Sequence, residues 1–290
     1  MTTSNIDLIR EWIEQNPSPD FPPTIENSMI ERFLYVCEGD IKRTKDVLQL
    51  FFKFRKSIPE IFTNRDPLTK NQINIFNTVD VRCVFPLPKK TDEGYQVYIS
   101  HLLDSNVDKF DFLEYSKMFF NITDVRMKTE EKIPKGDIPI FDMTGFSLKH
   151  LMKLMFSLNL VKKYMRITQE AHPVYLKQIH VINTSPLLEK VLTMLRPLMR
   201  EEVKKMIHFH TEGSNTIFEY ISPDIIPVDF GGRGTPISDI KAHWWKQIEN
   251  NREWLLTNPW RNNSDLKSGK NLVNTNVEEG YEVFSSLNLD

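Results

Sequence analysis

Two stretches of the chain repeat one order of elements: a short apolar strand, a polar turn and an apolar helix. In the first, residues 138–142 read as a strand, and the turn 144–147 leads into a long helix. In the second, the strand 177–182 is followed by Ser185 as an N-cap and Pro186 at the first helical position, where a missing N–H costs nothing. Strands that alternate with helices need crossover connections, so the sequence predicts an α/β fold with a largely parallel sheet.

Hydrophobic periodicity predicts the remaining elements. Further strands are expected at 95–100 and 207–210, and further helices at 112–126, 216–221 and 238–256. Thr216 and Glu219 have capping-box spacing in the short helix. The Pro- and Gly-rich segment 223–236 is predicted to be an ordered loop.

The pattern divides the chain into four parts. We predict an N-terminal helical lobe at 1–85, an α/β domain at 86–235, a C-terminal helix at 236–256 and a polar tail at 257–290. The lobe carries three short amphipathic stripes, which need one another to bury their apolar faces. The tail is rich in Asn and is expected to be mobile, although its apolar end could dock back.

Composition limits the class of protein. The 290 residues are 40% hydrophobic and 26% charged, as in a globular protein. Lys and Arg number 37 against 39 Asp and Glu, which gives a net charge of −2. This balance offers no basic field for a nucleic-acid partner.

The two cysteines and the chain's apolar segments indicate a cellular compartment. Cys37 and Cys83 are too few for a disulfide framework, and we expect reduced thiols. The N-terminal residues carry acidic side chains and have no apolar core typical of a signal peptide. The charge-free apolar run 154–161 is too short to span a bilayer. The expected location is cytoplasmic.

Catalytic and metal-binding motifs are not found in the sequence, so no enzyme, catalytic residue, metal or cofactor is predicted. Walker A, GxGxxG and HExxH patterns are missing, and Gly145-x-Ser147 lacks the second Gly of a nucleophile elbow. His208 and His210 would share one strand face, which His180 and His172 could approach. They have no Cys or acidic partner at ligand spacing, so hydrogen-bonded strand histidines are favoured over a metal site.

The two helices that follow the strands 138–142 and 177–182 are unusually apolar. Residues 146–165 are apolar nearly all round the helix, and seven of the eleven methionines lie between Met143 and Met206. A second stripe covers 187–199, where Pro197 weakens the helix near its end. Flexible Met side chains suit a wall that fits an irregular apolar guest, but a Met-rich packed core has the same composition.

Several segments along the chain form a recognisable set. They are 30–37 (IERFLYVC), 52–62 (FKFRKSIPEIF), 138–147 (IPIFDMTGFS), 175–183 (YLKQIHVIN) and 225–232 (IIPVDFGG). In these segments and their order, the chain resembles the CRAL-TRIO (Sec14-like) lipid-transfer family, and within it the tocopherol-transfer proteins and their insect relatives.

The resemblance implies an apolar cavity between the sheet and its helices, closed by a mobile gate helix at 186–199. Among the implied wall residues, Tyr164, Thr168 and His172 are the polar candidates for gripping a ligand hydroxyl or carbonyl. The implied ligand-binding residues are Phe119, Phe120, Thr123, Phe141, Phe146, Tyr164, Ile167, Thr168, His172, Val174, Ile179, Leu188, Val191, Met194 and Met199.

Tocopherol-transfer relatives also grip a membrane phosphoinositide with basic residues. At the matching positions this chain has Tyr35, Tyr175 and Met206, and only Lys177 is basic. A possible phosphoinositide contact therefore rests on Lys177 together with the nearby basic residues Arg200, Lys204 and Lys205.

The resemblance implies a cytosolic carrier that transfers a small hydrophobic ligand, such as a tocopherol, retinoid, carotenoid or sterol-like lipid, during transient contact with membranes. A phospholipid or phosphatidylinositol carrier is the first alternative, and it needs a polar head-group subsite in the cavity. The second alternative is a protein-interaction module that uses Trp244, Trp245 and Trp254.

Overall fold

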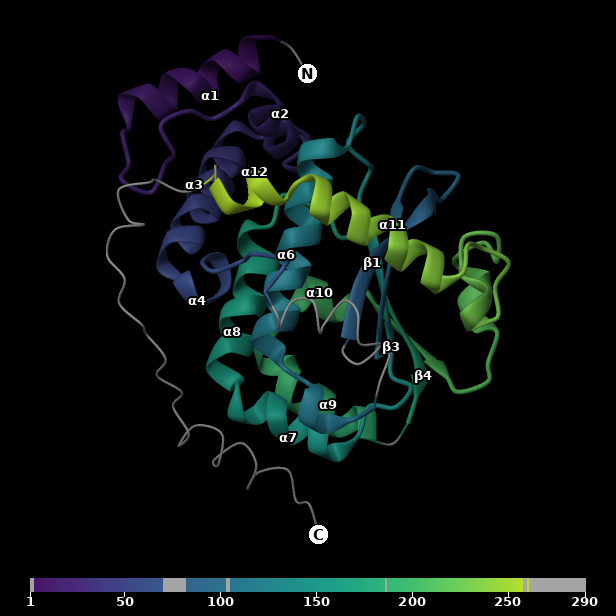
Figure 1. Ribbon diagram of the computed structural model, residues 1–290. Helices are drawn as coiled ribbons and strands as arrows, with labels where there is room; N and C mark the ends of the chain where they lie inside the picture. Colours follow the sequence, from purple (N-terminus) through teal and green to yellow (C-terminus); the bar gives the residue numbers. More distant parts are fainter. Residues whose placement is uncertain (1–2, 70–81, 103–104, 186, 258–259, 261–290) are drawn as a thin grey trace.

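A five-stranded sheet forms the centre of the protein (Figure 1). The computed structural model describes residues 3–69, 82–102, 105–185, 187–257 and 260. The strands lie in chain order, with β1 and β2 antiparallel and the following pairs parallel. This confirms the predicted α/β class and the largely parallel sheet. The strands are β1 (Arg82–Lys90), β2 (Gln96–Leu102), β3 (Asp137–Asp142), β4 (Ile179–Thr184) and β5 (Ile207–Thr211).

Helices make the crossovers between the parallel strands. Between β2 and β3 lie the short 3-10 helix η1 (Val107–Lys109) and α6 (Phe112–Thr129). Asp111 begins α6 because its carboxylate accepts hydrogen bonds from the backbone N–H groups of Leu113 and Glu114. Between β3 and β4 lie α7 (Leu148–Phe156), α8 (Leu158–Arg166) and one π-helical turn, η2 (Ile167–Ala171). Between β4 and β5 lie α9 (Leu187–Leu195), the 3-10 helix η3 (Arg196–Leu198) and α10 (Glu201–Lys205).

The helix predicted to run unbroken from 146 to 165 is two helices. Ser157 separates them: it caps the end of α7 and precedes α8. Apolar residues on all sides of this segment hide the break in the sequence pattern.

The turn after β3 is built by one carboxylate. Oδ1 of Asp142 accepts hydrogen bonds from the backbone N–H and the hydroxyl of Thr144, at 3.0 and 2.8 Å, and from the side-chain amide of Asn183 at 2.8 Å. Gly145 takes a φ of 74°, a left-handed conformation that favours glycine. Asp142 and Gly145 thus fix the direction in which the chain leaves the sheet toward α7.

The N-terminal lobe contains α1 (Thr3–Gln15), α2 (Asn27–Val36), α3 (Ile41–Ser57) and α4 (Pro59–Phe62). Its core is aromatic: the Phe51 ring meets those of Phe33 and Phe52 edge to face, with centroids 5.3 and 5.2 Å apart. The lobe was expected to be helical to residue 85, but β1 begins at Arg82, and this strand was not predicted. Cys37 is a buried free thiol whose pKa is raised by burial, while the side chain of Cys83 lies outside the described residues.

The C-terminal helical segment packs against the sheet on the face of Val97 and Ile99. The single helix predicted at 238–256 is two, because Asn251 separates them. The indole N–H of Trp244 donates a 3.0 Å hydrogen bond to the carbonyl of Pro86, so this tryptophan anchors the helix. The remaining elements are η4 (Thr216–Glu219), η5 (Val228–Phe230), α11 (Ile237–Asn250) and α12 (Arg252–Thr257).

The segment predicted as a capped helix at 216–221 is the single 3-10 turn η4. Asn215, not Thr216, occupies its N-cap position, and the Asn215 side chain makes no capping bond. The hydroxyl of Thr216 instead lies 2.8 Å from Nδ1 of His210. The predicted polar tail at 257–290 lies almost wholly outside the described residues. In the part of the chain that is described, no helix has the length and apolar character needed to cross a membrane.

Candidate functional site

A cavity of about 290 Å³ lies between the sheet and the helices α6, α8 and α9. This is close to the lower end of the range of about 300–1,000 Å³ that is typical of small-molecule pockets. The sheet forms its floor through alternate residues of each strand, because side chains along a strand point to opposite faces in turn. The floor residues that alternate in this way are Val84, Tyr98, Ser100, Asp137, Pro139, Phe141, Ile179, Val181 and Ile207.

Most of the residues predicted from the family resemblance lie on the wall of this cavity. They come from the sheet and the turn after β3, from α6, α8 and α9, and from the segments that follow α8 and α9. The predicted residues found on the wall are Phe119, Thr123, Phe141, Phe146, Tyr164, Thr168, His172, Val174, Ile179, Val191 and Met199.

Three of the predicted residues lie outside the cavity wall. Phe120 follows Phe119 on α6, points about 100° round the helix and packs against Phe62 with ring centroids 4.8 Å apart. Ile167 belongs to the buried cluster of the N-terminal lobe. Met194 is buried with residues of α7 and α8. The side chain of Leu188 lies outside the described ones.

The predicted gate segment consists of α9 and η3. Val191, Leu192 and Leu195 face the cavity from α9. The α-helix ends at Leu195, and Pro197 lies in the following 3-10 turn, since proline has no N–H for a further α-helical hydrogen bond. The predicted weakening near Pro197 is therefore a change of helix type.

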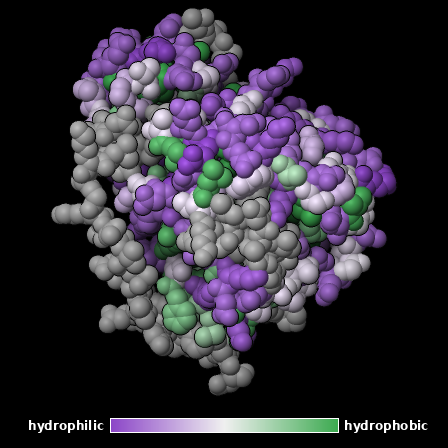
Figure 2. Space-filling model, in the orientation of Figure 1, coloured by the Kyte–Doolittle hydropathy of each residue, from purple (hydrophilic) through white to green (hydrophobic). Residues whose placement is uncertain are grey.

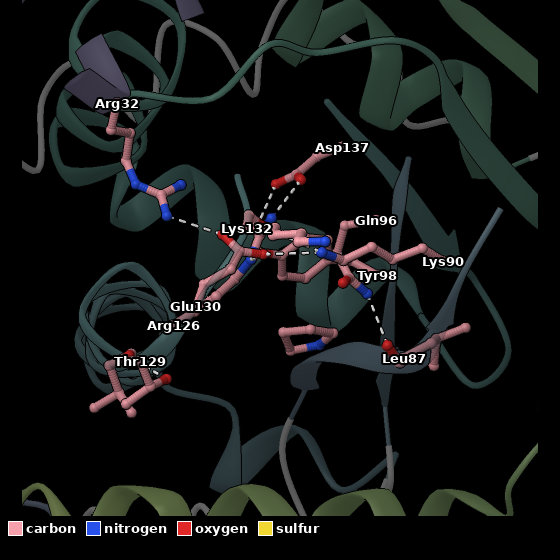
Figure 3. Close-up of polar contacts among 12 residues, drawn as sticks. Arg32, Leu87, Lys90, Gln96, Tyr98, Arg126, Thr129, Glu130, Lys132 and Asp137 are labelled. Atoms are coloured by element: carbon pink, nitrogen blue, oxygen red, sulfur yellow. Dashed lines mark hydrogen bonds and ion pairs between the residues drawn. The ribbon is translucent and has the colours of Figure 1, made fainter. Parts of the chain in front are cut away.

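One end of the cavity borders a buried polar network that the sequence did not reveal (Figure 3). Arg126 of α6 makes a two-pronged ion pair with Asp137 of β3, with Nη–Oδ distances of 2.8 and 2.9 Å, and also contacts the hydroxyl of Tyr98. Glu130 accepts from Arg126 at 3.3 Å and from Arg32 of the N-terminal lobe at 2.9 Å. Burial acts to lower the pKa of Arg126, but the Asp137 carboxylate outweighs it and raises the pKa well above its ordinary value.

This network leaves the cavity without a free positive charge. Asp137 is the one acidic residue on the wall, and no Lys or Arg lies on the wall in the described part of the chain. Because Arg126 already engages both carboxylate oxygens of Asp137, neither group is free for a ligand. A phosphate in this cavity would meet no cation, so the wall favours a neutral guest.

The three polar candidates predicted for the wall are placed there, with different hydrogen-bonding states. The Thr168 hydroxyl donates within its own helix, 3.1 Å from the Tyr164 carbonyl oxygen. The Tyr164 ring packs edge to face on those of Phe112 and Phe119. Burial lowers the pKa of His172 to about 3, so its imidazole is neutral near pH 7.

The strand histidines gather on the other face of the sheet. Nδ1 of His180 lies 2.9 Å from Nε2 of His210, and the His208 ring stacks on His180 with centroids 5.1 Å apart. His172 does not join them, because it lies on the cavity wall. Nowhere in the described residues does a group of three or more His, Cys, Asp or Glu stand so that it could hold a metal ion.

Three of the predicted basic residues, Arg200, Lys204 and Lys205, lie in or directly before α10. Lys204 pairs with Glu201 at 2.7 Å and Arg200 with Glu202 at 3.6 Å. The ammonium group of Lys177 lies over the ring of Tyr95 at 5.5 Å from its centroid. Polar side chains cover most of the face seen in Figure 2, with hydrophobic ones scattered between them.

The tryptophans proposed for protein recognition are packed inward. Trp244 is buried, and Trp245 and Trp254 pack against the same core cluster. The Trp254 ring also meets that of Trp260 edge to face. These contacts account for the tryptophans by packing and leave the interaction hypothesis without support.

The fold and the cavity define an α/β protein with an apolar chamber between a largely parallel sheet and a helical cover. Family models match the chain in two places: the CRAL/TRIO domain over residues 82–232, and the Pinta-like UBA domain over residues 1–72. The first match covers more than half of the chain, which therefore belongs to the CRAL/TRIO domain family.

Relatives of known name are distant in sequence. The alpha-tocopherol transfer protein-like protein of Homo sapiens is 21% identical over 231 residues, which cover 79% of this chain and 64% of the relative. Clavesin-1 of Xenopus laevis is 24% identical over 237 residues, or 80% of this chain and 68% of the relative. The chain thus spans somewhat less than two thirds of the tocopherol transfer protein-like relatives. The crystal structure of Sfh5 aligns with a TM-score of 0.47 at 14% identity and covers 96% of this chain and 84% of that one.

Proposed function

We propose that the protein binds one small neutral hydrophobic ligand in the cavity and carries it between membranes. The observation that carries this proposal is the character of the wall, which is mostly apolar and has no free cation among the described residues. A tocopherol, retinoid, carotenoid or sterol-like lipid has the matching chemistry, with an extended hydrocarbon body and at most a few neutral oxygens. The names of the tocopherol transfer protein-like relatives support the same class of ligand.

The energetics favour a carrier that shields its ligand from water. A guest that buries about 500 Å² of apolar surface gains about 12 kcal/mol on leaving water, at about 25 cal/mol per Å². A lipid taken from a bilayer was already out of water, so its net gain is far smaller. The protein then acts mainly by lowering the barrier to crossing the aqueous phase, which requires a gate that opens at a membrane and closes in solution.

Extraction of lipid from vesicles tests this proposal. The full chain is mixed with sucrose-loaded vesicles of phosphatidylcholine that contain α-tocopherol, retinol, β-carotene or cholesterol, the vesicles are pelleted, and the lipid in the supernatant is identified by mass spectrometry. We expect about one neutral lipid per chain. Recovery of phosphatidylcholine or phosphatidylinositol as the main lipid would replace the proposal by the phospholipid alternative, and no recovered lipid would refute transfer.

We also propose that the four predicted parts of the chain, 1–85, 86–235, 236–256 and 257–290, have separate roles in the carrier. The N-terminal lobe supports α6, which forms one side of the cavity. Arg55 and Arg65 of the lobe reach Asp124 of α6 at 2.5 and 2.7 Å, and all three side chains are buried. Burial acts to raise the pKa of Asp124, but these two arginines outweigh it and lower the pKa below its usual range.

Contact with the membrane is proposed to involve the surface around Lys177, Arg200, Lys204 and Lys205. Two of these cations are already paired with neighbouring glutamates, which weakens their attraction to an anionic lipid. Comparison of transfer to vesicles with and without phosphatidylinositol bisphosphate tests this contact. We expect a difference of less than about threefold, since partly neutralised surface charges contribute little. The buried free thiol of Cys37 is consistent with a cytoplasmic carrier.

A further inference from the structure

Ser100 places an unsatisfied hydroxyl on the floor of the cavity. Only 1% of the residue is exposed, and its Oγ has no hydrogen-bond partner within the described part of the chain. The backbone of Ser100 pairs with Val84 of β1 on one side and Phe141 of β3 on the other. Ser100 and both of these neighbours line the cavity, so the hydroxyl stands on an apolar floor.

Such a hydroxyl makes the empty cavity less stable than an apolar residue would. Buried polar groups in folded proteins nearly always have a partner, because a lone buried hydroxyl loses its bonds to water without replacement. Other wall hydroxyls have described partners: those of Thr168 and Thr123 donate to carbonyl oxygens of their own helical segments, and that of Tyr98 accepts from Arg126. Ser100 lies in the extended strand β2, whose backbone pairs with β1 and β3. Its side-chain hydroxyl makes no comparable bond to a described residue.

We infer that the Ser100 hydroxyl is the hydrogen-bonding partner of a single neutral oxygen of the bound ligand, an alcohol or a carbonyl. This inference rests on the proposed function and names the chemical class of its ligand. A serine hydroxyl both donates and accepts, so it suits an alcohol as well as a ketone, aldehyde or ester carbonyl. A charged oxygen is disfavoured, because Asp137 lies on the same floor and Arg126 is already committed to it.

Two substitutions isolate the hydroxyl. Ser100→Ala removes it with the smallest change of shape. Ser116→Ala is the matched control, because Ser116 is equally buried, donates to the Phe112 carbonyl oxygen at 2.7 Å and is not on the cavity wall. Binding of farnesol, and of the hydrocarbon that has its carbon skeleton but no hydroxyl, is measured by native mass spectrometry with the full chain. Thermal unfolding without ligand is recorded for each variant.

We expect S100A to bind farnesol about 2- to 10-fold more weakly than the wild type, as for the loss of one hydrogen bond. Its affinity for the hydrocarbon should be unchanged, and its unfolding temperature should not fall, because it loses an unsatisfied group. S116A should bind both probes as the wild type does. The inference is overturned if S100A binds farnesol as tightly as the wild type, because the hydroxyl would then bond only a buried water. It is also overturned if S100A binds both probes more weakly by the same factor, because that would show a packing role.

The two failures are distinguishable. If S100A retains farnesol affinity while the wild type extracts neutral lipid from vesicles, only the role of Ser100 is wrong. If the wild type binds neither probe and extracts no lipid, the proposed function fails and the inference with it.

Discussion

The side-chain amide of Gln169 joins the π-helical turn to the end of the gate segment. Its Nε2 donates to the carbonyl oxygen of Leu198 at 2.9 Å, and its Oε1 accepts from the backbone N–H of Arg200 at 2.8 Å. Nε2 also donates to the carbonyl oxygen of Met165 at 2.9 Å, within its own helical segment. One side chain thus contacts the C-terminal end of the predicted gate segment at two backbone positions beside the cavity wall.

Gln169→Leu should loosen the gate while keeping the volume of the side chain. Two lost hydrogen bonds of about 0.5–1.5 kcal/mol each amount to about 1–3 kcal/mol, so the open state should become roughly 5- to 150-fold more populated. We expect faster release of bound lipid to acceptor vesicles and faster amide hydrogen exchange at residues 196–200. Gln15→Leu is the control, because Gln15 bonds Glu11 on the exposed side of α1. Equal release rates for Q169L and the wild type would show that Gln169 does not restrain the gate.

Val191→Trp should fill the cavity from the gate side. Val191 is only 6% exposed and lies on the wall, so a larger ring there must enter the cavity or displace α9. We expect lipid extraction to fall at least about tenfold, at a stability cost of about 1–3 kcal/mol for overpacking. Circular dichroism of the same sample verifies folding. Val228→Trp, at a 52% exposed site, is the control. Undiminished extraction by a folded V191W would place the ligand elsewhere.

The ion pair of Arg126 and Asp137 should behave as a buried unit. Arg126→Met leaves the Asp137 carboxylate without its cation, whereas Glu130 keeps Arg32, and the stranded charge should destabilise the protein by about 3–5 kcal/mol in urea unfolding. Adding Asp137→Asn should recover part of that loss, since it removes the stranded charge. Arg166→Met is the matched control, because the Arg166–Glu170 pair is exposed and should contribute at most about 1 kcal/mol. If R126M and R166M cost the same, the buried network does not stabilise the fold.

The sequence predicted most of the parallel sheet because its strands are short apolar runs followed by strong helix starts. It missed β1, since Pro86 and Pro88 argue against a strand. The structure resolves the conflict: β1 is an edge strand that pairs only with β2, and the carbonyl of Pro86 receives the indole N–H of Trp244. A partner 158 residues away is not visible in local periodicity.

The cavity wall was predicted less well than the fold, for a related reason. Apolar residues that line a cavity and those that fill a core have the same pattern along a helix. Val191 and Met194 both lie in an apolar stripe, yet only Val191 reaches the cavity. Ser100 was missed because one small polar residue in a strand usually marks a solvent-facing position. Whether such a residue faces solvent or a cavity depends on the helices packed over the strand, and the sequence of β2 does not specify them.

His180 gives the fold a defined response to acid. The residue is fully buried, and burial together with the neighbouring His210 and His208 lowers its pKa to about 3. In the unfolded chain the same imidazole takes up a proton near pH 6.5. Between these two values the unfolded state binds more protons, so the contribution of His180 to stability is complete above pH 6.5 and decreases as the pH falls toward 3.

His180→Gln should therefore flatten the pH dependence of unfolding. In the wild type this histidine contributes a slope of up to about 1.4 kcal/mol per pH unit below pH 6.5. The free energy of unfolding, measured in urea at several values between pH 7 and pH 4, should decline less steeply in the variant, even though its stability at pH 7 is lower. The exposed His243, replaced by Gln, serves as the control and should keep the wild-type slope. Parallel curves for H180Q and the wild type would mean that the imidazole of His180 is not the acid-sensitive group, and that acid acts through another buried group such as His172.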